Sequence, residues 1–304
     1  MASYLIYTDS AADMPAGDYA KYDIRIIPME YMLNGKSVLF HTESPDHQKY
    51  CDELFEAQKS NAEVSTTQIT PYNYTEIWTP ELEAGNDILY ICFSSGMSAT
   101  FDNARMAADQ LKEDYPDRTI RVVDSLSGTC GQGIVTLCAG INRDEKGMDM
   151  EENAQWLEKW IPHVCHRFIV GDLHYLHRGG RVSKASAVVG TMLNIKPGLI
   201  IDDKGSLQVV SKTRGKQAAM KKLVDAYVRQ SAINEEGTED LPKVIFCDYG
   251  SNTEDIPVFR KMLEDAVGPD VRIEFICVTP ILGVHVGSWF LSVCGWGNKR
   301  KEEE

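Results

Sequence analysis

Hydroxyl side chains gather in four short segments in the first half of the chain. The segments are 8–13 (TDSAAD), 65–70 (STTQIT), 94–100 (SSGMSAT) and 124–129 (DSLSGT). Serine and threonine at the start of a helix can cap its unpaired N–H groups, and the same groups can also hold an anion. Helix capping explains any one of these segments. Because four segments share the same composition, an anion site made of neutral donors is about as well supported as capping.

Segment 94–100 also raises the question of a serine nucleophile. The chain reads FSSGM around Ser95 and so lacks the first glycine of the G-x-S-x-G nucleophile elbow. The first strand is not followed by G-x-G-x-x-G, and G-x-x-x-x-G-K-[ST] does not occur in the sequence. Neither a serine hydrolase nor a nucleotide-binding protein has its usual motif, although an enzyme that uses Ser95 with His285 stays open as an alternative.

The histidines favour a ligand site at one position only. His285 lies in an apolar segment with flanking glycines, where a core histidine and a ligand-site histidine are about equally expected. His163 and His166 are spaced for a metal on a helix, as are His174 and His177, but H-E-x-x-H is absent. We therefore interpret these four as surface or hinge residues and predict no metal site.

A local cluster of arginines stands out in an acidic chain. Arg178 and Arg181 bracket two glycines, and Arg214 follows in KTRGK. Guanidinium groups on a flexible turn can bind a phosphate or the carboxylates of a partner in bidentate fashion. A solvated turn without a ligand explains the same residues about as well.

The elements that must position these residues alternate in the first half. Short apolar runs at 4–8, 24–28, 87–93 and 119–124 predict strands, and helical patterns between them predict a mostly parallel sheet. In such a sheet, loops after the strands lie at one edge, where ligands bind. The hydroxyl-rich segments are therefore expected to converge.

Other elements follow from local signals. Asn34-Gly35 between strand-like residues predicts a β-hairpin. Ser44 and Pro45 predict the start of a helix, and two further helices are expected between 130 and 162.

The second half has a different pattern. Residues 194–215 predict two antiparallel strands joined by an Asp-Asp-Lys-Gly turn, followed by a helix, a strand, a helix and a strand. We predict an α/β fold with an N-terminal domain (1–163) built on a mostly parallel sheet. The C-terminal α/β domain (164–304) is expected to have a mixed or antiparallel sheet.

Composition limits the possible partners. The 304 residues carry 31 basic and 45 acidic side chains, a net charge of −14, which disfavours nucleic acid and anionic membrane surfaces as partners. Apolar runs are too short for a membrane-spanning segment, and eight scattered cysteines without CxxC are typical of a reducing compartment. We expect a soluble, cytoplasmic protein.

Taken together, these motifs resemble the DegV family of bacterial fatty-acid-binding proteins. The resemblance runs in order from YLIYTDSAADMP through STTQITP, SSGMSATFDNA and LHRGGRVSKASAVVGTMLNIKPGLIIDDKG to GVHVGSW. It implies two α/β domains with an apolar tunnel between them that holds one long-chain fatty acid. It also implies a lipid-binding protein without catalytic activity and without a cofactor, the bound fatty acid being its ligand.

The resemblance further implies roles for particular residues. The fatty-acid carboxylate is expected at Ser65 and Thr66, at Ser94 or Ser95, and at His285. Better-understood relatives present the carboxylate to a separate ATP-dependent kinase subunit, which forms acyl-phosphate for phospholipid synthesis. Contacts to that partner or to phosphate are expected at the arginines already named, Arg178, Arg181 and Arg214.

Overall fold

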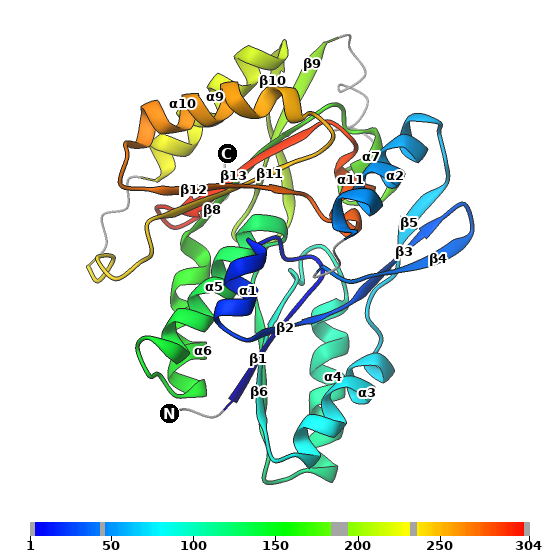
Figure 1. Ribbon diagram of the computed structural model, residues 1–304, viewed down its shortest axis with the longest axis vertical. Helices are drawn as coiled ribbons and strands as arrows, with labels where there is room; N and C mark the ends of the chain where they lie inside the picture. The colour runs from blue at the N-terminus through cyan, green and yellow to red at the C-terminus, as the bar shows by residue number, and fades with distance from the viewer. Residues whose placement is uncertain (1–3, 43–45, 184–193, 232–235, 301–304) are drawn as a thin grey trace.

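The described part of the chain has an α/β fold with three β-sheets (Figure 1). A computed structural model describes residues 4–42, 46–183, 194–231 and 236–300. Ser44, Pro45 and most of the segment between Arg181 and Asn194 lie outside the described residues.

The first sheet is entirely parallel, as predicted. Its order is β2-β1-β6-β7, and the bounds are β1 (Tyr4–Asp9), β2 (Ile24–Ile27), β6 (Asp87–Cys92) and β7 (Ile120–Asp124). Successive side chains of a strand point to opposite faces, so alternate residues of β6 pack into the hydrophobic cores on the two sides of this sheet. One face packs on α3 (Pro71–Glu83) and α4 (Thr100–Asp114), the other on α1 (Ala16–Lys21), α5 (Thr129–Asp144) and α6 (Met150–Trp160).

A smaller antiparallel sheet contains the predicted hairpin. Strands β3 (Met29–Leu33) and β4 (Lys36–Phe40) are joined at Asn34 and Gly35, whose φ angles of 50° and 76° suit a tight hairpin turn. Strand β5 (Val64–Thr66) pairs with β3 after the helix α2 (His47–Lys59). This pairing brings the STTQIT segment beside the parallel sheet.

The second half forms a six-stranded mixed sheet of order β10-β9-β8-β13-β11-β12. Only β11 and β12 pair in parallel; the other neighbours are antiparallel. The strands are β8 (Val164–Val170), β9 (Ile195–Ile201), β10 (Leu207–Arg214), β11 (Val244–Tyr249), β12 (Arg272–Cys277) and β13 (Phe290–Trp296). The helical segments are η1 (Ile161–His163), α7 (His174–Arg178), α9 (Lys216–Gln230), η3 (Thr253–Asp255), α10 (Ile256–Val267) and α11 (Pro280–Val286).

The sequence predictions account for most of these elements. The four parallel strands, the hairpin, the helices α5 and α6, and the antiparallel pair β9 and β10 are confirmed. Strands β8 and β13 were not predicted, although both are apolar. Interpreting His163 and His166 as surface or hinge residues is wrong, because each is only 4% exposed.

The two halves share their hydrophobic cores. Helices α9 and α10 cover one face of the six-stranded sheet, and its other face packs towards the first half. Phe168 and Phe290 thus join a core that also contains Tyr90 and Trp78. Within the described residues, no helix is both long and apolar enough to span a bilayer.

Candidate functional site

A cavity of about 470 Å³ lies where the two halves meet. All four hydroxyl-rich segments contribute to its wall, through Ala11, Thr66, Ser98 and Thr129 among others. The prediction that these segments converge is therefore confirmed. The opposite wall comes from the second half and is mainly apolar: Phe168, Leu176, Ile201, Leu207, Ile281, Leu282, Val286 and Phe290.

Backbone contacts hold two of these segments together. The Thr129 N–H donates to the Ala11 carbonyl at 2.7 Å, and the Asp13 N–H donates to the Thr129 carbonyl at 3.1 Å. Thr129 has a φ of 49°, which a β-branched residue rarely adopts. Such conformations persist where the surroundings enforce them, often at ligand sites.

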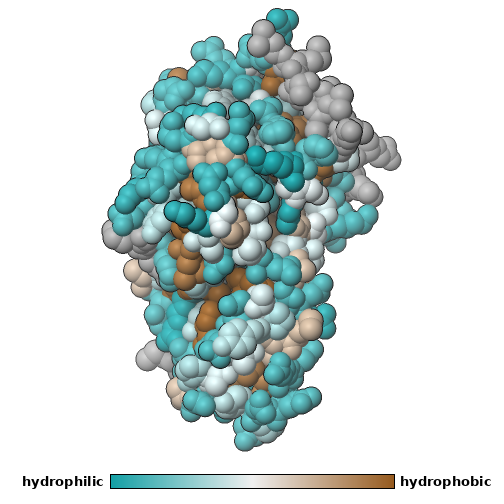
Figure 2. Space-filling view, turned by 90° about the vertical axis from the view of Figure 1, so that its right-hand side faces the viewer, coloured by the Kyte–Doolittle hydropathy of each residue, from teal (hydrophilic) through white to brown (hydrophobic). Residues whose placement is uncertain are grey.

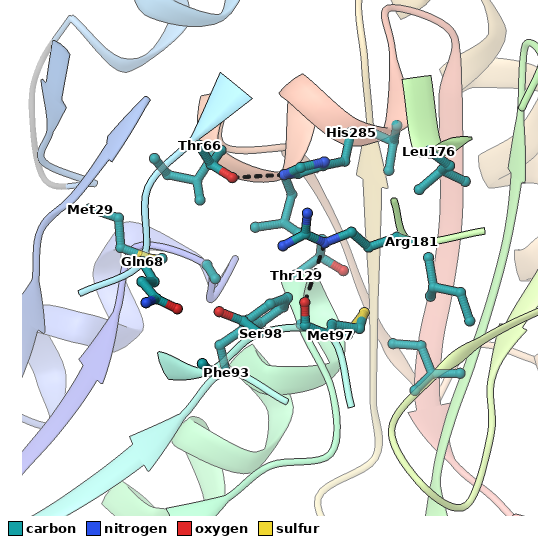
Figure 3. A pocket seen from close by; sticks show the side chains of 18 of the residues that line it. Met29, Thr66, Gln68, Phe93, Met97, Ser98, Thr129, Leu176, Arg181 and His285 are labelled. Atoms are coloured by element: carbon teal, nitrogen blue, oxygen red, sulfur yellow. Dashed lines mark hydrogen bonds between the residues drawn. The ribbon is translucent and has the colours of Figure 1, made fainter. Parts of the chain in front are cut away.

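Thr66 and His285 are brought together on the cavity wall, 219 positions apart in sequence. Thr66 Oγ1 lies 2.8 Å from His285 Nε2 (Figure 3). Burial, together with the positive charges of Arg181 and Arg178, lowers the pKa of His285 to about 3, so the ring is neutral at pH 7. Its Nδ1 is buried and has no hydrogen-bond partner among the described residues.

This environment favours one tautomer of the ring. A buried N–H without an acceptor is rarer than a buried acceptor without a donor. We therefore assign the proton of His285 to Nε2, which donates to Thr66 Oγ1. The Thr66 hydroxyl proton then remains available to a ligand in the cavity.

Arg181 also lines the cavity, whereas the sequence predicts it as a contact to a partner or to phosphate. Its guanidinium donates to the carbonyl oxygens of Met97, at 3.2 Å, and of Gly179. Burial lowers its pKa, yet no carboxylate pairs with it in the part of the chain that the structure describes. The cavity therefore has a cationic group whose charge a bound anion would balance.

Ser94, Ser95 and Ser65 do not line this cavity. Ser94 is fully buried, and its Oγ donates to the Gly205 carbonyl at 2.8 Å. Ser95 and Ser65 are exposed.

Segment 94–100 instead packs against the turn between β9 and β10. Gly96 lies so close to that turn that a Cβ there would meet the Lys204 carbonyl oxygen at 2.5 Å. Part of this segment thus joins the two halves, and its cavity residues are Met97, Ser98 and Ala99.

The remaining predicted arginines lie outside the cavity. Arg178 is exposed and lies over the ring of Tyr175, 5.3 Å from its centroid. Arg214 is exposed at the end of β10. Both are accessible to a partner; among the described hydrogen bonds and ion pairs, none joins them to Thr66 or His285, although the charge of Arg178 acts on the His285 ring.

His166 and Gln68 line the cavity and were not predicted as site residues. The two ring nitrogens of His166 face the hydroxyls of Ser127, at 3.2 Å, and Thr129, at 3.3 Å. Burial and the charge of Arg300 lower the pKa of His166 to about 3. The sequence did contain a signal for His166. It lies two residues before Phe168 in the run CHRFIV, and strand residues two apart share a face.

The site can bind a mainly apolar molecule that carries one anionic group. Aromatic and aliphatic side chains would cover the apolar part, and Arg181, Thr66 and Ser98 offer donors to the anion. The volume falls within the range of about 300–1,000 Å³ that is usual for small-molecule pockets. Figure 2 also shows apolar residues in the middle of one face, surrounded by hydrophilic ones.

Comparisons with known proteins agree with the architecture. A DegV domain-containing protein of Streptococcus pyogenes is 31% identical over 96% of this chain and 97% of its own length. A structure described as fatty acid binding of a DegV family protein from Thermus thermophilus has a TM-score of 0.80 at 23% identity, covering 97% of this chain and 99% of that one. A stearic acid-binding protein of Eubacterium ventriosum has a TM-score of 0.79 at 22% identity, covering 96% and 98%.

The family comparison covers nearly the whole chain. The model described as "Uncharacterised protein, DegV family" matches residues 3–296, which include all three described sheets and the residues that line the cavity. The chain belongs to the DegV family.

Proposed function

We propose that this chain binds a long-chain fatty acid in the cavity between its two halves. The observation that carries the proposal is the partly buried guanidinium of Arg181, which lines an otherwise mainly apolar cavity without a carboxylate partner in the described structure. A fatty-acid carboxylate would balance this charge. The Thr66 hydroxyl, oriented by His285, would donate a second hydrogen bond to the same carboxylate.

The acyl chain would supply most of the affinity. Burial of each methylene group contributes about 0.8 kcal/mol, so ten methylenes contribute on the order of 8 kcal/mol. A carboxylate, in contrast, loses its hydration on entering the cavity, and its hydrogen bonds largely offset that cost. The polar end would thus orient the ligand, whereas the apolar wall would retain it.

The relatives lend support by analogy. The Thermus thermophilus structure is described as binding a fatty acid, and the Eubacterium ventriosum protein as binding stearic acid. For this chain we propose Thr66, His285 and Arg181 as the main carboxylate residues, with Ser98 nearby. The further predicted residues Ser65, Ser94 and Ser95 have less support because they do not line the cavity.

A partnership with an ATP-dependent kinase subunit extends the proposal. The bound carboxylate would be phosphorylated by that subunit to acyl-phosphate for phospholipid synthesis. The exposed Arg178 and Arg214 would be available to the partner or to its phosphate groups.

The alternative, an acyl hydrolase or transferase that uses Ser95 and His285, has less support. Ser95 is exposed and does not line the cavity, and the Nε2 of His285 contacts Thr66. Among the described contacts, none joins Ser95 to His285.

Native mass spectrometry of the purified chain tests the proposal. We expect a mass increase that solvent extraction identifies as one long-chain fatty acid. A chain purified without lipid that does not bind added fatty acid would contradict the proposal. Turnover of acyl esters by the purified chain, abolished in Ser95→Ala, would favour the enzymatic alternative instead.

A further inference from the structure

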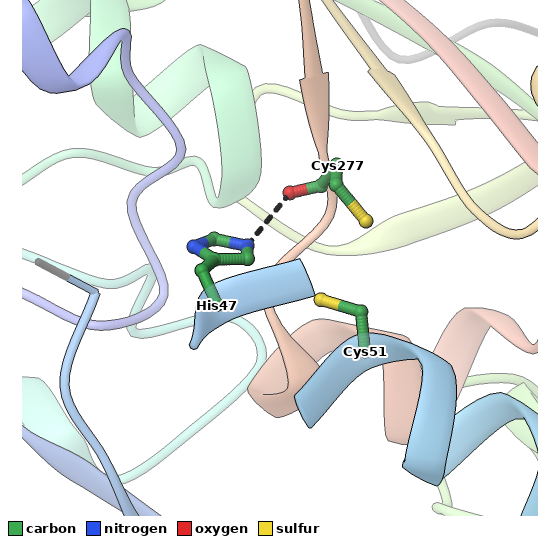
Figure 4. Close-up of side chains that lie close together, drawn as sticks. All are labelled: His47, Cys51 and Cys277. Carbon is green, nitrogen blue, oxygen red and sulfur yellow. Dashed lines mark hydrogen bonds between the residues drawn. The ribbon is translucent and has the colours of Figure 1, made fainter. Parts of the chain in front are cut away.

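Two thiols and an imidazole lie close together outside the cavity just described. Cys51 belongs to α2, Cys277 ends β12, and His47 begins α2 (Figure 4). One ligand atom from each lies within 4.8 Å of the other two. Both cysteines are buried, Cys51 fully and Cys277 to 7% exposure, and His47 is partly buried.

The ring of His47 is held between two backbone carbonyl oxygens. Its Nε2 lies 3.2 Å from the Cys277 oxygen, and its Nδ1 lies 3.5 Å from the Thr42 oxygen. A neutral imidazole, the form that binds metals, carries a single N–H. Only one of the two carbonyls can therefore accept a hydrogen bond, and the other ring nitrogen turns a lone pair towards an oxygen.

A metal ion would remove this conflict. Histidines that bind a metal through one nitrogen usually donate the other N–H to a carbonyl or carboxylate. With its Nδ1 proton directed to Thr42, His47 keeps the Nε2 lone pair on the side of Cys277. Because Nε2 lies 3.2 Å from the Cys277 backbone oxygen, the ring has to turn away from that carbonyl and towards the two sulfur atoms before Nε2 can bond to a metal.

A second cavity, of about 660 Å³, gives access to this group. His47, Cys277 and Asp13 line it. Asp13 is 1% exposed, and its Oδ2 has no hydrogen-bond partner among the described residues. Its Oδ1 accepts a hydrogen bond from the Thr279 N–H at 3.2 Å.

The other buried group of this kind is less suited to a metal. His166, Asp248 and Cys294 also lie within 4.8 Å of one another. Asp248, however, already accepts hydrogen bonds from Cys130 Sγ at 2.8 Å and from Ser292 Oγ at 2.5 Å. A cation there would have to displace donors.

We propose that His47, Cys51 and Cys277 bind one thiophilic d10 cation of the Zn²⁺ type, with a water molecule from the adjoining cavity as fourth ligand. Zinc bonds of about 2.3 Å to sulfur and 2.0–2.1 Å to nitrogen put tetrahedral ligand atoms about 3.4–3.8 Å apart. The ligand atoms, which lie within 4.8 Å of one another, therefore need to approach by up to about 1.4 Å.

Binding has chemical and structural consequences. Each thiol loses its proton to solvent when its sulfur bonds to the metal, so binding releases two protons. The Cys51 thiol donates to the Val278 carbonyl oxygen at 3.4 Å, and this is one of the two protons released. The bound cation would link α2 to the end of β12, and α11 begins three residues after that end.

The test uses the reduced full-length chain after removal of metal with a chelator. Titration with Zn²⁺ in buffers of different ionisation enthalpy measures stoichiometry and proton release, and Co²⁺ reports thiolate ligands by its charge-transfer absorption. We expect one ion per chain and two protons released. Cys51→Ala and Cys277→Ala should each weaken binding by more than about 100-fold, since even outer-shell changes cost 10–100-fold.

Two further variants guard against indirect effects. Cys138→Ala removes a buried thiol of α5 that belongs to neither group, and it should bind Zn²⁺ as the unaltered chain does. His47→Gln removes a ligand at the edge of the core, so it remains informative if Cys51→Ala fails to fold.

Three results would overturn the assignment. One is Zn²⁺ binding that persists in the Cys51→Ala/Cys277→Ala double variant. Another is a cobalt complex without thiolate absorption. The third is a reduced chain that does not bind Zn²⁺ but forms a Cys51–Cys277 disulfide with hydrogen peroxide, which would identify a redox pair. None of these results depends on whether the chain binds fatty acid.

Discussion

Replacement of Arg181 by glutamine should weaken fatty-acid binding strongly while leaving the fold intact. Arg181→Gln removes the positive charge from the cavity wall but keeps a polar side chain that can still contact the Met97 carbonyl. Because the described structure has no carboxylate paired with Arg181, its loss breaks no ion pair of the unliganded protein. The unliganded variant should therefore unfold at nearly the same temperature.

The size of the effect follows from the environment of the guanidinium. Unit charges 4 Å apart at an effective dielectric constant of 20 attract by about 4 kcal/mol, which is an upper limit for a partly exposed pair. Hydrogen bonds to charged groups contribute about 1.5–3 kcal/mol. We adopt the latter range, which corresponds to a loss of affinity of about 10- to 150-fold.

Isothermal titration with a long-chain fatty acid, and with the alcohol of the same chain length, measures this effect. The alcohol has no charge, so Arg181→Gln should change its affinity by less than about threefold, and the difference isolates the contact between carboxylate and guanidinium. Arg214→Gln is the matched control, since Arg214 is exposed and does not line the cavity. Equal losses for acid and alcohol, or unchanged affinity for the acid, would refute the assignment of the carboxylate to Arg181.

Three further outcomes are expected. Thr66→Val keeps the side-chain shape but removes the hydroxyl, so affinity for the acid should fall about tenfold or more in the same titration, whereas Ser95→Ala should leave it unchanged. Ser94→Ala leaves the buried Gly205 carbonyl without its donor and should lower the free energy of unfolding in urea by about 1–3 kcal/mol. A loss of lipid affinity without a loss of stability would instead favour Ser94 as a ligand residue. The folded-state pKa of His285, about 3, lies below the value in the unfolded chain. The neutral ring therefore contributes its full stability above pH 6.5, and this contribution is lost as the pH falls towards 3. Thermal unfolding of His285→Gln should show a smaller decrease in melting temperature than the unaltered chain over that pH range.

Local sequence signals determined the order and type of most elements. Asn34-Gly35 specifies a hairpin because its two residues accept positive φ, and Thr70 begins α3 because its hydroxyl caps the Asn73 N–H. Convergence of the hydroxyl-rich segments also followed from the sequence, because the strands before three of them are parallel. These features depend on neighbours in the chain or on one sheet.

The tertiary structure alone decided which side chains reach the cavity. The Thr66–His285 contact spans 219 positions, and that between Ser94 and Gly205 spans 111. Arg181 is far from both Thr66 and His285 in the sequence, yet its guanidinium lies on the same cavity wall. Composition indicates that a serine or an arginine could bind an anion, but which one does so depends on how the two halves pack, because that packing buries Ser94, exposes Ser95 and turns Arg181 inward.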